Sequence, residues 1–522
     1  MFFMTDKQQR ALETVKKIDK EVTLLGHIGA TVSWDQETYM PEGAVEGKSQ
    51  QASLLSKLGH QRMTSSELAQ ALSDLGADDT LVQEIRLEKG ASHLPQDISI
   101  SEKALIRSVY RHHSRAVKVP EKLVTELSEL GARAQNAWVK ARKANDFPMF
   151  QPYLEKLVDL KRQEVQAVGY EDHPYDALLD EFEPGMKTSE VTQVFQGLRD
   201  DLVPLVKRIA DSPQVKDDFL ERTYPISGQE SFGYKVLDAL GYDMKRGRMD
   251  ISAHPFTTSL GSDDVRITTR YAENYFKTGI FSIIHEAGHG LYELGFSPDI
   301  KDTGLATGTS LGIHESQSRT WENMIGRSLP FWNHFLPVLK QEFPGLLDDV
   351  DTKAFFRGIN KVEPSYIRVE ADEVTYSLHI MLRFFLETKL ITGEIQVKDL
   401  PELWRQESRD LLGIVPETDS LGVLQDVHWS FGLFGYFPTY SLGNIIGAQF
   451  YQVMEKDLGS IDALVEAGNF GPILGWLRTN IHHHGSVKNA GELLQDITGG
   501  GLDAKPFVAY LKGKYSGVYG FS

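Results

Sequence analysis

Apolar residues recur every three or four positions along most of the chain, which is the spacing of an amphipathic α-helix. The first such segment begins at Thr5 and Gln8, which form a capping-box pattern, and its apolar positions are Leu12, Val15, Ile18, Val22 and Leu25. The same spacing predicts further helices over residues 121–146, 154–168, 352–359, 371–390, 400–412 and 444–458. We therefore expect a protein that is mostly α-helical.

The alternation that is typical of a β-strand is clearest at residues 264–271, where Val265 and Ile267 alternate with Arg266 and Thr268. An exposed edge of this strand would leave backbone groups available for hydrogen bonds with another extended segment. Proline and glycine mark isolated turns, and the sequence contains no linker, low-complexity tract or internal repeat. We expect one small sheet in a single unit over residues 1–522, with room for two lobes around a cleft.

Composition narrows the class of protein. A chain of 522 residues with 41% hydrophobic residues can bury a large core. Its net charge of −18 disfavours nucleic acid and anionic membranes as partners. The sequence has neither a signal-peptide pattern nor a run of about 18 apolar residues, so we expect a cytoplasmic protein without a membrane span. Because it contains no cysteine, a metal site would use nitrogen and oxygen ligands.

The strongest chemical signal is the motif H-E-x-x-H formed by His285, Glu286 and His289 within an apolar, helix-compatible segment. Residues four apart on a helix lie almost one above the other, so both imidazoles can bind the same zinc ion. Glu286 follows the first ligand and can act as general base on a water at the metal. The motif therefore predicts a hydrolytic metal centre.

A catalytic zinc site normally has three protein ligands, and Glu315 is the predicted third. It begins a second helical segment, and two packed helices would bring it to the metal. The alternative is that Glu315 only stabilises the start of its own helix through the helix dipole. Glu293, one turn beyond His289, is a rival that we expect to point past the metal, and Asp302 is a weaker rival.

Six short motifs occur in a fixed order, at residues 254–256 (HPF), 264–268 (DVRIT), 285–289 (HEAGH), 314–317 (HESQ), 367–372 (IRVEAD) and 422–429 (GVLQDVHW). Together they resemble the signature set of the M32 family of metallocarboxypeptidases. Segments 34–41 (WDQETYMP) and 175–180 (YDALLD) are also similar to this family, so the resemblance covers the whole chain. It implies a helical, cleft-bearing fold like that of neurolysin and angiotensin-converting enzyme. It also implies a carboxypeptidase supported by one zinc or cobalt ion per subunit, and a homodimer.

A carboxypeptidase must recognise a free C-terminal carboxylate, and a guanidinium group does so with two parallel charge-assisted hydrogen bonds. Arg368 is the predicted carboxylate-binding residue, because the resemblance implies that its motif binds substrate. The alternative is that Arg368 only pairs with Glu370 or Asp372. Arg266 is the second candidate, although we expect it to order its strand by pairing with Asp264.

The oxyanion of the tetrahedral intermediate needs a hydrogen-bond donor. The candidates are His254, His428, Tyr436 and Tyr440, and the sequence does not rank them. Gln425 and Asp426 are expected to support substrate binding by fixing a histidine tautomer or holding a helix in place.

Two other functions remain open at this point. The same metal motif would serve a metallo-oligopeptidase that cuts internal bonds of short peptides. A metal-stabilised binding protein without catalysis is the alternative from another class. Glu286 argues against the second, because a structural zinc ion needs no base and usually has four protein ligands.

Overall fold

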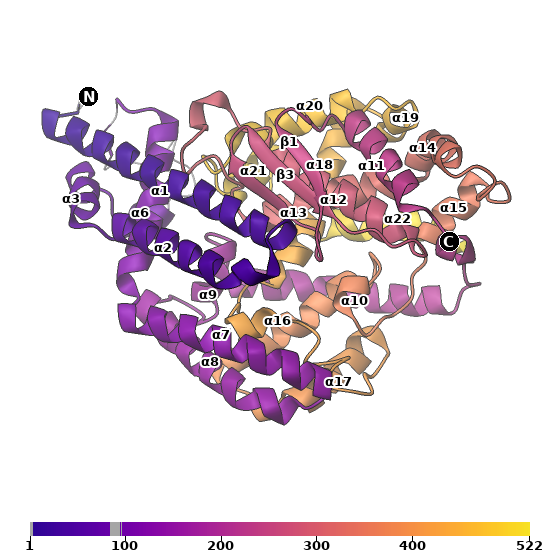
Figure 1. Ribbon diagram of the computed structural model, residues 1–522, viewed down its shortest axis with the longest axis horizontal. Helices are drawn as coiled ribbons and strands as arrows, with labels where there is room; N and C mark the ends of the chain where they lie inside the picture. The colour runs from indigo at the N-terminus through magenta and orange to yellow at the C-terminus, as the bar shows by residue number, and fades with distance from the viewer. Residues whose placement is uncertain (1–3, 84–93, 96, 522) are drawn as a thin grey trace. The chain divides into compact units, whose positions relative to one another are not determined.

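The computed structural model describes residues 4–83, 94–95 and 97–521 (Figure 1). The α-helices are α1 Asp6–Thr38, α2 Val45–Met63, α3 Ser66–Leu75, α4 Asp79–Gln83, α6 Ile100–Lys118, α7 Glu121–Ala144, α8 Phe147–Val168, α9 Asp176–Phe182, α10 Thr188–Ala210, α11 Ile226–Leu240, α12 Phe276–Glu293, α13 Leu311–Arg319, α14 Leu329–Glu342, α15 Thr352–Ile359, α16 Tyr376–Thr392, α17 Leu400–Leu412, α18 Pro438–Leu458, α19 Ile461–Glu466, α20 Gly471–Asn480, α21 Ala490–Thr498 and α22 Lys505–Tyr519. The strands are β1 Gly247–Ile251, β2 Thr257–Gly261 and β3 Asp264–Thr269. The prediction of a mostly helical protein with one small sheet is confirmed.

The chain folds into two compact units, each assembled from three separate segments. Unit 1 consists of Met1–Val117, Asp217–Ile359 and Phe450–Gly501. Unit 2 consists of Lys118–Lys216, Asn360–Gln449 and Leu502–Ser522. The H-E-x-x-H motif and Glu315 belong to unit 1, whereas Arg368 and the tyrosine candidates belong to unit 2.

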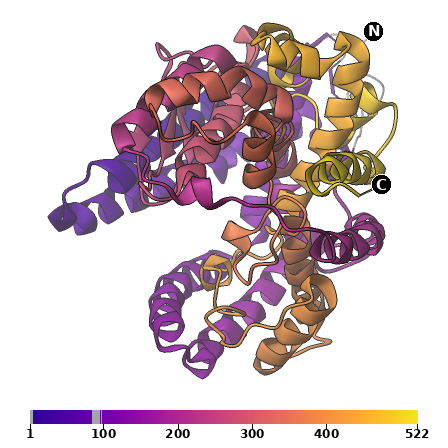
Figure 2. The ribbon, with the colours of Figure 1, turned by 90° about the vertical axis from the view of Figure 1, so that its right-hand side faces the viewer.

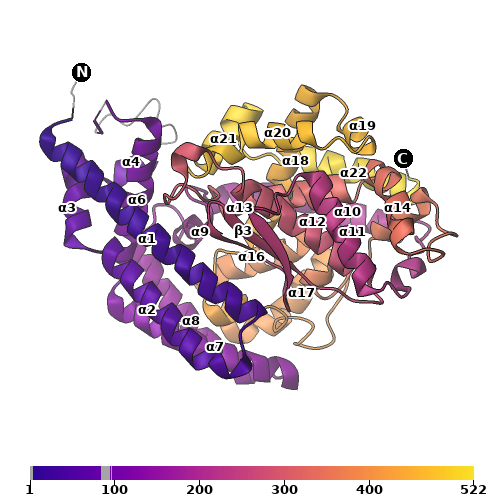
Figure 3. The same cartoon turned by 45° about the horizontal axis from the view of Figure 1, so that its top comes forward.

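Helix α1 begins at the predicted capping box, in which the Thr5 side chain accepts a hydrogen bond from the backbone of Gln8. Leu12, Val15 and Ile18 are at most 2% exposed, so the first half of the predicted apolar face is buried in unit 1. Helix α2 lies beside α1 (Figure 3) and has no buried residue.

The sheet of unit 1 has the strand order β1-β3-β2, with β1 parallel and β2 antiparallel to β3. Val265 and Ile267 are fully buried on the face of β3 that packs against α12, as the alternation predicted. Because β3 is the central strand, both of its edges are paired, and the expectation that it offers an exposed edge is wrong. Strand β2 is the edge strand on this side of the sheet.

Unit 2 contains the paired helices α7 and α8, which lie side by side in purple in Figure 2. Helix α16 also packs on α8 and α17. Most residues of α16 are buried, including two charged residues, Arg383 and Glu387, whose side chains are fully inaccessible. A buried charge requires a partner, so these two positions indicate polar networks inside unit 2.

Across the described residues, no helix combines the length and the apolar character that a membrane span requires.

Candidate active site

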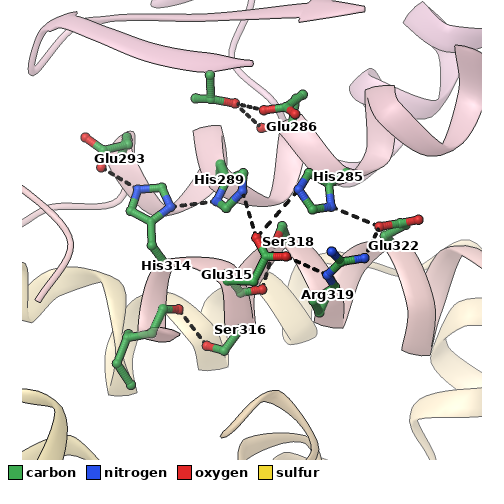
Figure 4. A network of polar contacts seen from close by, with 12 residues as sticks. His285, Glu286, His289, Glu293, His314, Glu315, Ser316, Ser318, Arg319 and Glu322 are labelled. Atoms are coloured by element: carbon green, nitrogen blue, oxygen red, sulfur yellow. Dashed lines mark hydrogen bonds and ion pairs between the residues drawn. The ribbon is translucent and has the colours of Figure 1, made fainter. Parts of the chain in front are cut away.

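His285 and His289 lie on α12 one turn apart, and their Nε2 atoms face the Glu315 carboxylate on α13 (Figure 4). Glu315 Oε2 is 3.7 Å from His285 Nε2 and 3.4 Å from His289 Nε2. These three donor atoms all lie within 4.8 Å of one another, and no other such His/Asp/Glu group occurs among the described residues. The arrangement can accommodate a single ion.

Gly288, between the two histidines, allows α13 to approach this closely. A β-carbon at residue 288 would lie 2.6 Å from Ser318 Cα and 2.8 Å from the carbonyl oxygen of Gln317. Both atoms belong to the backbone, so no side-chain rearrangement would relieve the contact. The small residue in the motif therefore keeps Glu315 within reach of the two imidazoles.

The surroundings of Glu315 and His289 favour the deprotonated forms that can bind a cation. Burial favours protonation of Glu315, but Arg319, whose Nε lies 2.6 Å from Oε1, and the histidines hold the Glu315 pKa well below its usual range. Burial also lowers the pKa of His289 to about 3. Burial lowers the pKa of His285 as well, but Glu315 and Glu322 outweigh it and raise that pKa above its usual value. Two imidazole nitrogens and one carboxylate oxygen form a donor set that suits zinc and related divalent ions.

The far nitrogen of each imidazole has its own partner. His285 Nδ1 lies 2.9 Å from Glu322 Oε2, on the π-helix η4 Thr320–Gly326. Arg327 and Arg319 also contact the Glu322 carboxylate, at 2.9 and 3.3 Å. His289 Nδ1 instead lies 2.6 Å from His314 Nδ1. Such contacts fix the tautomer and the orientation of a metal-binding imidazole.

Glu286 points away from its two neighbouring histidines (Figure 4) and is only 6% exposed. Its Oε2 accepts a hydrogen bond of 2.6 Å from Thr257 Oγ1 on β2. Burial raises the pKa of Glu286, although His285 and the Thr257 hydroxyl act in the opposite direction. A carboxylate with a raised pKa is a better proton acceptor, as a general base requires.

The rival ligands lie outside the metal-binding group. Glu293 Oε1 contacts His314 Nε2 at 2.7 Å and does not face the three donor atoms. Asp302 is exposed and has a left-handed backbone conformation with φ of 57°. Neither residue belongs to the group formed by the donors of α12 and α13.

The two remaining candidates of unit 1 lie on or beside the sheet. Arg266 forms a bidentate ion pair with Asp264, with N–O distances of 2.8 and 2.7 Å. Its guanidinium carbon also lies 4.5 Å from the centre of the Trp34 ring. His254 is exposed in the loop between β1 and β2, and its carbonyl oxygen accepts a hydrogen bond from Ser252. Arg266 thus stabilises the junction of α1 with the sheet.

Arg368 is 5% exposed and pairs with Asp426 rather than with Glu370 or Asp372. Its Nε and Nη2 lie 3.0 and 2.8 Å from Asp426 Oδ1. Arg383 contacts the other oxygen of the same carboxylate, with Nε 2.7 Å from Oδ2. Burial favours protonation of Asp426, but the two guanidinium groups hold its pKa far below the usual range.

Gln425 bridges the two arginines. Its Oε1 accepts one hydrogen bond from the backbone amide of Arg368 at 2.9 Å and another from Arg383 Nη2 at 2.8 Å. Arg383 was not identified from the sequence. Its only sequence signal is a charged residue flanked on both sides by apolar residues of a helix that is otherwise buried.

Aromatic candidates surround Arg368. The Arg368 guanidinium carbon lies 5.1 Å from the centre of the Tyr440 ring. Tyr436 packs between His428 and Tyr440, with ring centres 5.4 and 5.5 Å apart. Burial lowers the pKa of His428 to about 4, so its imidazole is neutral at neutral pH. The structure thus brings four of the sequence candidates of unit 2 together: Arg368, His428, Tyr436 and Tyr440.

Glu387 anchors the loop that carries Tyr436, and it was not identified from the sequence. The fully buried carboxylate accepts hydrogen bonds from Tyr175 Oη at 2.6 Å, Trp429 Nε1 at 2.6 Å and the Gly435 amide at 3.0 Å. Gly435 has φ of 86°, and a β-carbon there would lie 2.6 Å from the Leu178 backbone. Glu387 therefore holds three separate segments of unit 2 in one place.

Comparisons with known proteins cover nearly the whole chain. Residues 14–515 match the family described as Carboxypeptidase Taq (M32) metallopeptidase. The chain is 41% identical over 522 residues to Thermostable carboxypeptidase 1 of Thermus thermophilus, covering 98% of this chain and 99% of that protein. It is 38% identical to Carboxypeptidase 1 of Bacillus subtilis, over 96% of this chain and 97% of that protein. The crystal structure of an M32 carboxypeptidase from Deinococcus radiodurans R1 superposes with a TM-score of 0.92 at 37% identity, covering 99% of this chain and 100% of the other.

Proposed function

The chain belongs to the Carboxypeptidase Taq (M32) metallopeptidase family, and we propose that His285, His289 and Glu315 bind its catalytic metal ion. As a member of this family, the protein is a metal-dependent carboxypeptidase, a hydrolase that removes residues from the C-terminus of peptides. The observation that carries the proposed ligand set is the convergence of two Nε2 atoms and one carboxylate oxygen within 4.8 Å.

Glu286 is the proposed general base. A bound divalent ion supplies Lewis acidity, which lowers the pKa of a water molecule and polarises the scissile carbonyl group. Glu286 accepts the proton of the attacking water and returns a proton to the leaving amine. Its raised pKa and the hydrogen bond that it accepts from Thr257 support this assignment.

Zinc is the proposed metal, with cobalt as a functional substitute and one ion per subunit. Two imidazoles and one carboxylate are the protein ligands of many catalytic zinc sites, in which a fourth position remains for water. The absence of cysteine from the sequence fits this donor set.

Arg368 is the proposed binding residue for the C-terminal carboxylate of the substrate. Arg368 and Arg383 share the single carboxylate of Asp426, and neither forms an ion pair with another acid among the described residues. The cluster therefore keeps a net positive charge in a buried environment, where an anionic group would stabilise it. Gln425 supports the two arginines, and His428, Tyr436, Tyr440 and the exposed His254 remain the candidates for the oxyanion donor.

We also propose a cytoplasmic homodimer of single catalytic units that binds peptides and not nucleic acid. Leu24, Ile28, Leu54 and Leu58 on α1 and α2 are 39–58% exposed, and such apolar surface is typical of an interface with a second copy. The net charge of −18 supports the absence of a polyanionic partner.

The direct test uses two N-acetylated peptides of about ten residues that differ only in a free or an amidated C-terminus. Mass spectra should show a ladder of products shortened one residue at a time from the free acid, and little cleavage of the amide, because only the acid offers a carboxylate to Arg368. Internal fragments from both peptides would instead favour a metallo-oligopeptidase.

A further inference from the structure

The edge strand β2 presents two hydroxyl groups toward the helix that carries the H-E-x-x-H motif. Thr257 pairs with Ile267 and Ser259 pairs with Val265 in the antiparallel register. Side chains alternate along a strand, so Thr257 and Ser259 share the face on which the buried Val265 and Ile267 pack against α12. Thr258 points to the opposite face.

The first hydroxyl holds the proposed general base. Thr257 Oγ1 lies 2.6 Å from Glu286 Oε2 and 3.0 Å from the carbonyl oxygen of the same residue. The Glu286 side chain is thus fixed against its own backbone, and one of its carboxylate oxygens is occupied. The other oxygen is then the one that is available to accept a proton.

The second hydroxyl begins a chain of contacts that ends at a proposed metal ligand. Ser259 Oγ donates to Glu293 Oε2 at 2.6 Å, and Glu293 Oε1 lies 2.7 Å from His314 Nε2. His314 Nδ1 in turn lies 2.6 Å from His289 Nδ1 (Figure 4).

The direction of these hydrogen bonds follows from the role of His289. If His289 Nε2 offers its lone pair to a metal, His289 Nδ1 carries the proton and donates it to His314 Nδ1. His314 Nε2 then carries a proton and donates it to the Glu293 carboxylate. Every contact from Ser259 to His289 is satisfied in this arrangement, with Glu293 as the common acceptor.

The carboxylates that hold the two proposed metal-binding imidazoles are therefore themselves held by different groups. Glu322, the partner of His285, is balanced by the guanidinium groups of Arg319 and Arg327. Glu293 forms no ion pair with Arg or Lys among the described residues, and it relies on Ser259 and His314. The Ser259 hydroxyl thus contributes one of the few contacts that fix this carboxylate.

We propose that β2 is the positioning strand of the active site. Thr257 fixes the general base Glu286, and Ser259 fixes the ligand His289 through Glu293 and His314. Both are positioning residues, because neither contacts the reacting atoms. This inference rests on the proposed function, in which Glu286 is the base and His289 is a metal ligand.

The test compares Thr257→Val, Ser259→Ala and Glu293→Gln with the matched control Thr258→Val, whose side chain lies on the other face of β2. For each variant, chelator competition measures the dissociation constant of Zn²⁺, and metal-saturated enzyme gives kcat and KM. Thr257→Val should lower kcat at least about 10-fold with unchanged KM and unchanged zinc affinity, because only the base is misplaced. Thr257→Ser keeps the hydroxyl and should restore kcat.

Glu293→Gln should weaken zinc binding about 10- to 100-fold, as is usual for a group that orients a metal ligand, and Ser259→Ala about 3- to 10-fold. Thr258→Val should match the unsubstituted protein in every measurement. Unchanged kcat in Thr257→Val, or unchanged zinc affinity in Ser259→Ala and Glu293→Gln, would overturn the inference.

The variant Glu286→Gln distinguishes a failure of the inference about β2 from a failure of the proposed function. If Glu286→Gln abolishes turnover while Thr257→Val does not, the base is correctly assigned and only the role of β2 is wrong. If Glu286→Gln retains turnover, the proposed function fails first.

Discussion

Gly288 on α12 and Ser318 on α13 approach so closely that a β-carbon at residue 288 would lie 2.6 Å from Ser318 Cα. This contact sets the separation of the two helices that carry the proposed metal ligands. The distances from Glu315 Oε2 to both histidines, 3.7 and 3.4 Å, depend on it.

We expect Gly288→Ala to force the two helices apart. Inserting one methyl group into a close-packed contact costs about 1–3 kcal/mol in the free energy of unfolding. The displacement of Glu315 should also weaken zinc binding, and urea unfolding with chelator competition measures both effects. The matched control is Gly197→Ala on α10, where nothing beyond its chain neighbours and the nearby backbone of its own helix lies within 4 Å of the added β-carbon. Equal zinc affinity in the two variants would show that the close approach does not set the site.

Glu315→Gln should abolish stable zinc binding. The substitution keeps the shape of the side chain but removes its negative charge. The two histidines then remain as the only strong protein ligands of the proposed site. Elemental analysis after dialysis should find zinc at background level in this variant. Asp302→Asn, at the exposed rival position, should retain full occupancy, and the opposite pattern would move the third ligand to Asp302.

Arg368→Lys should raise KM for peptides with a free C-terminus. A lysine keeps the positive charge but cannot form the bidentate hydrogen bonds of a guanidinium group. One charge-assisted hydrogen bond contributes about 1.5–3 kcal/mol. We therefore expect kcat/KM to fall about 10- to 100-fold in steady-state assays. Arg405→Lys, which alters an ion pair with Asp419 elsewhere in unit 2, serves as the control. An equal loss in both variants would remove Arg368 from the substrate site.

Glu387→Gln should change how stability depends on pH. Burial raises the pKa of Glu387 from 4.5 to about 7, despite its three hydrogen-bond donors. A folded-state pKa above the unfolded value means that the contribution of this group to stability is fully present below pH 4.5 and is lost as the pH rises through 7. The stability of the unsubstituted protein relative to Glu387→Gln should therefore fall from pH 5 to pH 8.

The size of that change is at most on the order of 3 kcal/mol, since one pKa unit corresponds to about 1.4 kcal/mol. Urea unfolding at both pH values measures it. Glu402→Gln, at an exposed position of α17, should show no comparable change. A difference between the unsubstituted protein and Glu387→Gln that rises with pH would contradict the assignment.

Much of the helical architecture could be predicted from the sequence, because the apolar spacing is a local signal. The predicted helices at residues 352–359 and 400–412 coincide with α15 and α17. Helix α8 begins at Phe147, earlier than predicted, because Asp146 caps it. Helix α16 begins later than predicted, because the Asp372 carboxylate accepts the backbone amides of Val374 and Thr375 and forms a turn there.

The candidate ligands could be found from the sequence because i, i+4 spacing on a helix is also local. The roles of four other residues could not be found in this way, since each acquires its role through a partner that is brought near by folding. These residues are His314, Glu322, Arg383 and Glu387. Arg368 illustrates the difference: the alternative to substrate binding paired it with Glu370 or Asp372, which are close in sequence, whereas its partner in the structure, Asp426, lies 58 positions away.

The most direct measurement determines zinc content and peptide turnover in Glu286→Gln beside the unsubstituted protein. Glu286 lies next to His285 but contacts Thr257 rather than the three donor atoms. We expect full zinc occupancy and a turnover number lowered at least about 100-fold, because the ligands remain and the proton acceptor is lost. Full occupancy with most of the turnover retained would contradict the assignment of Glu286 as the general base.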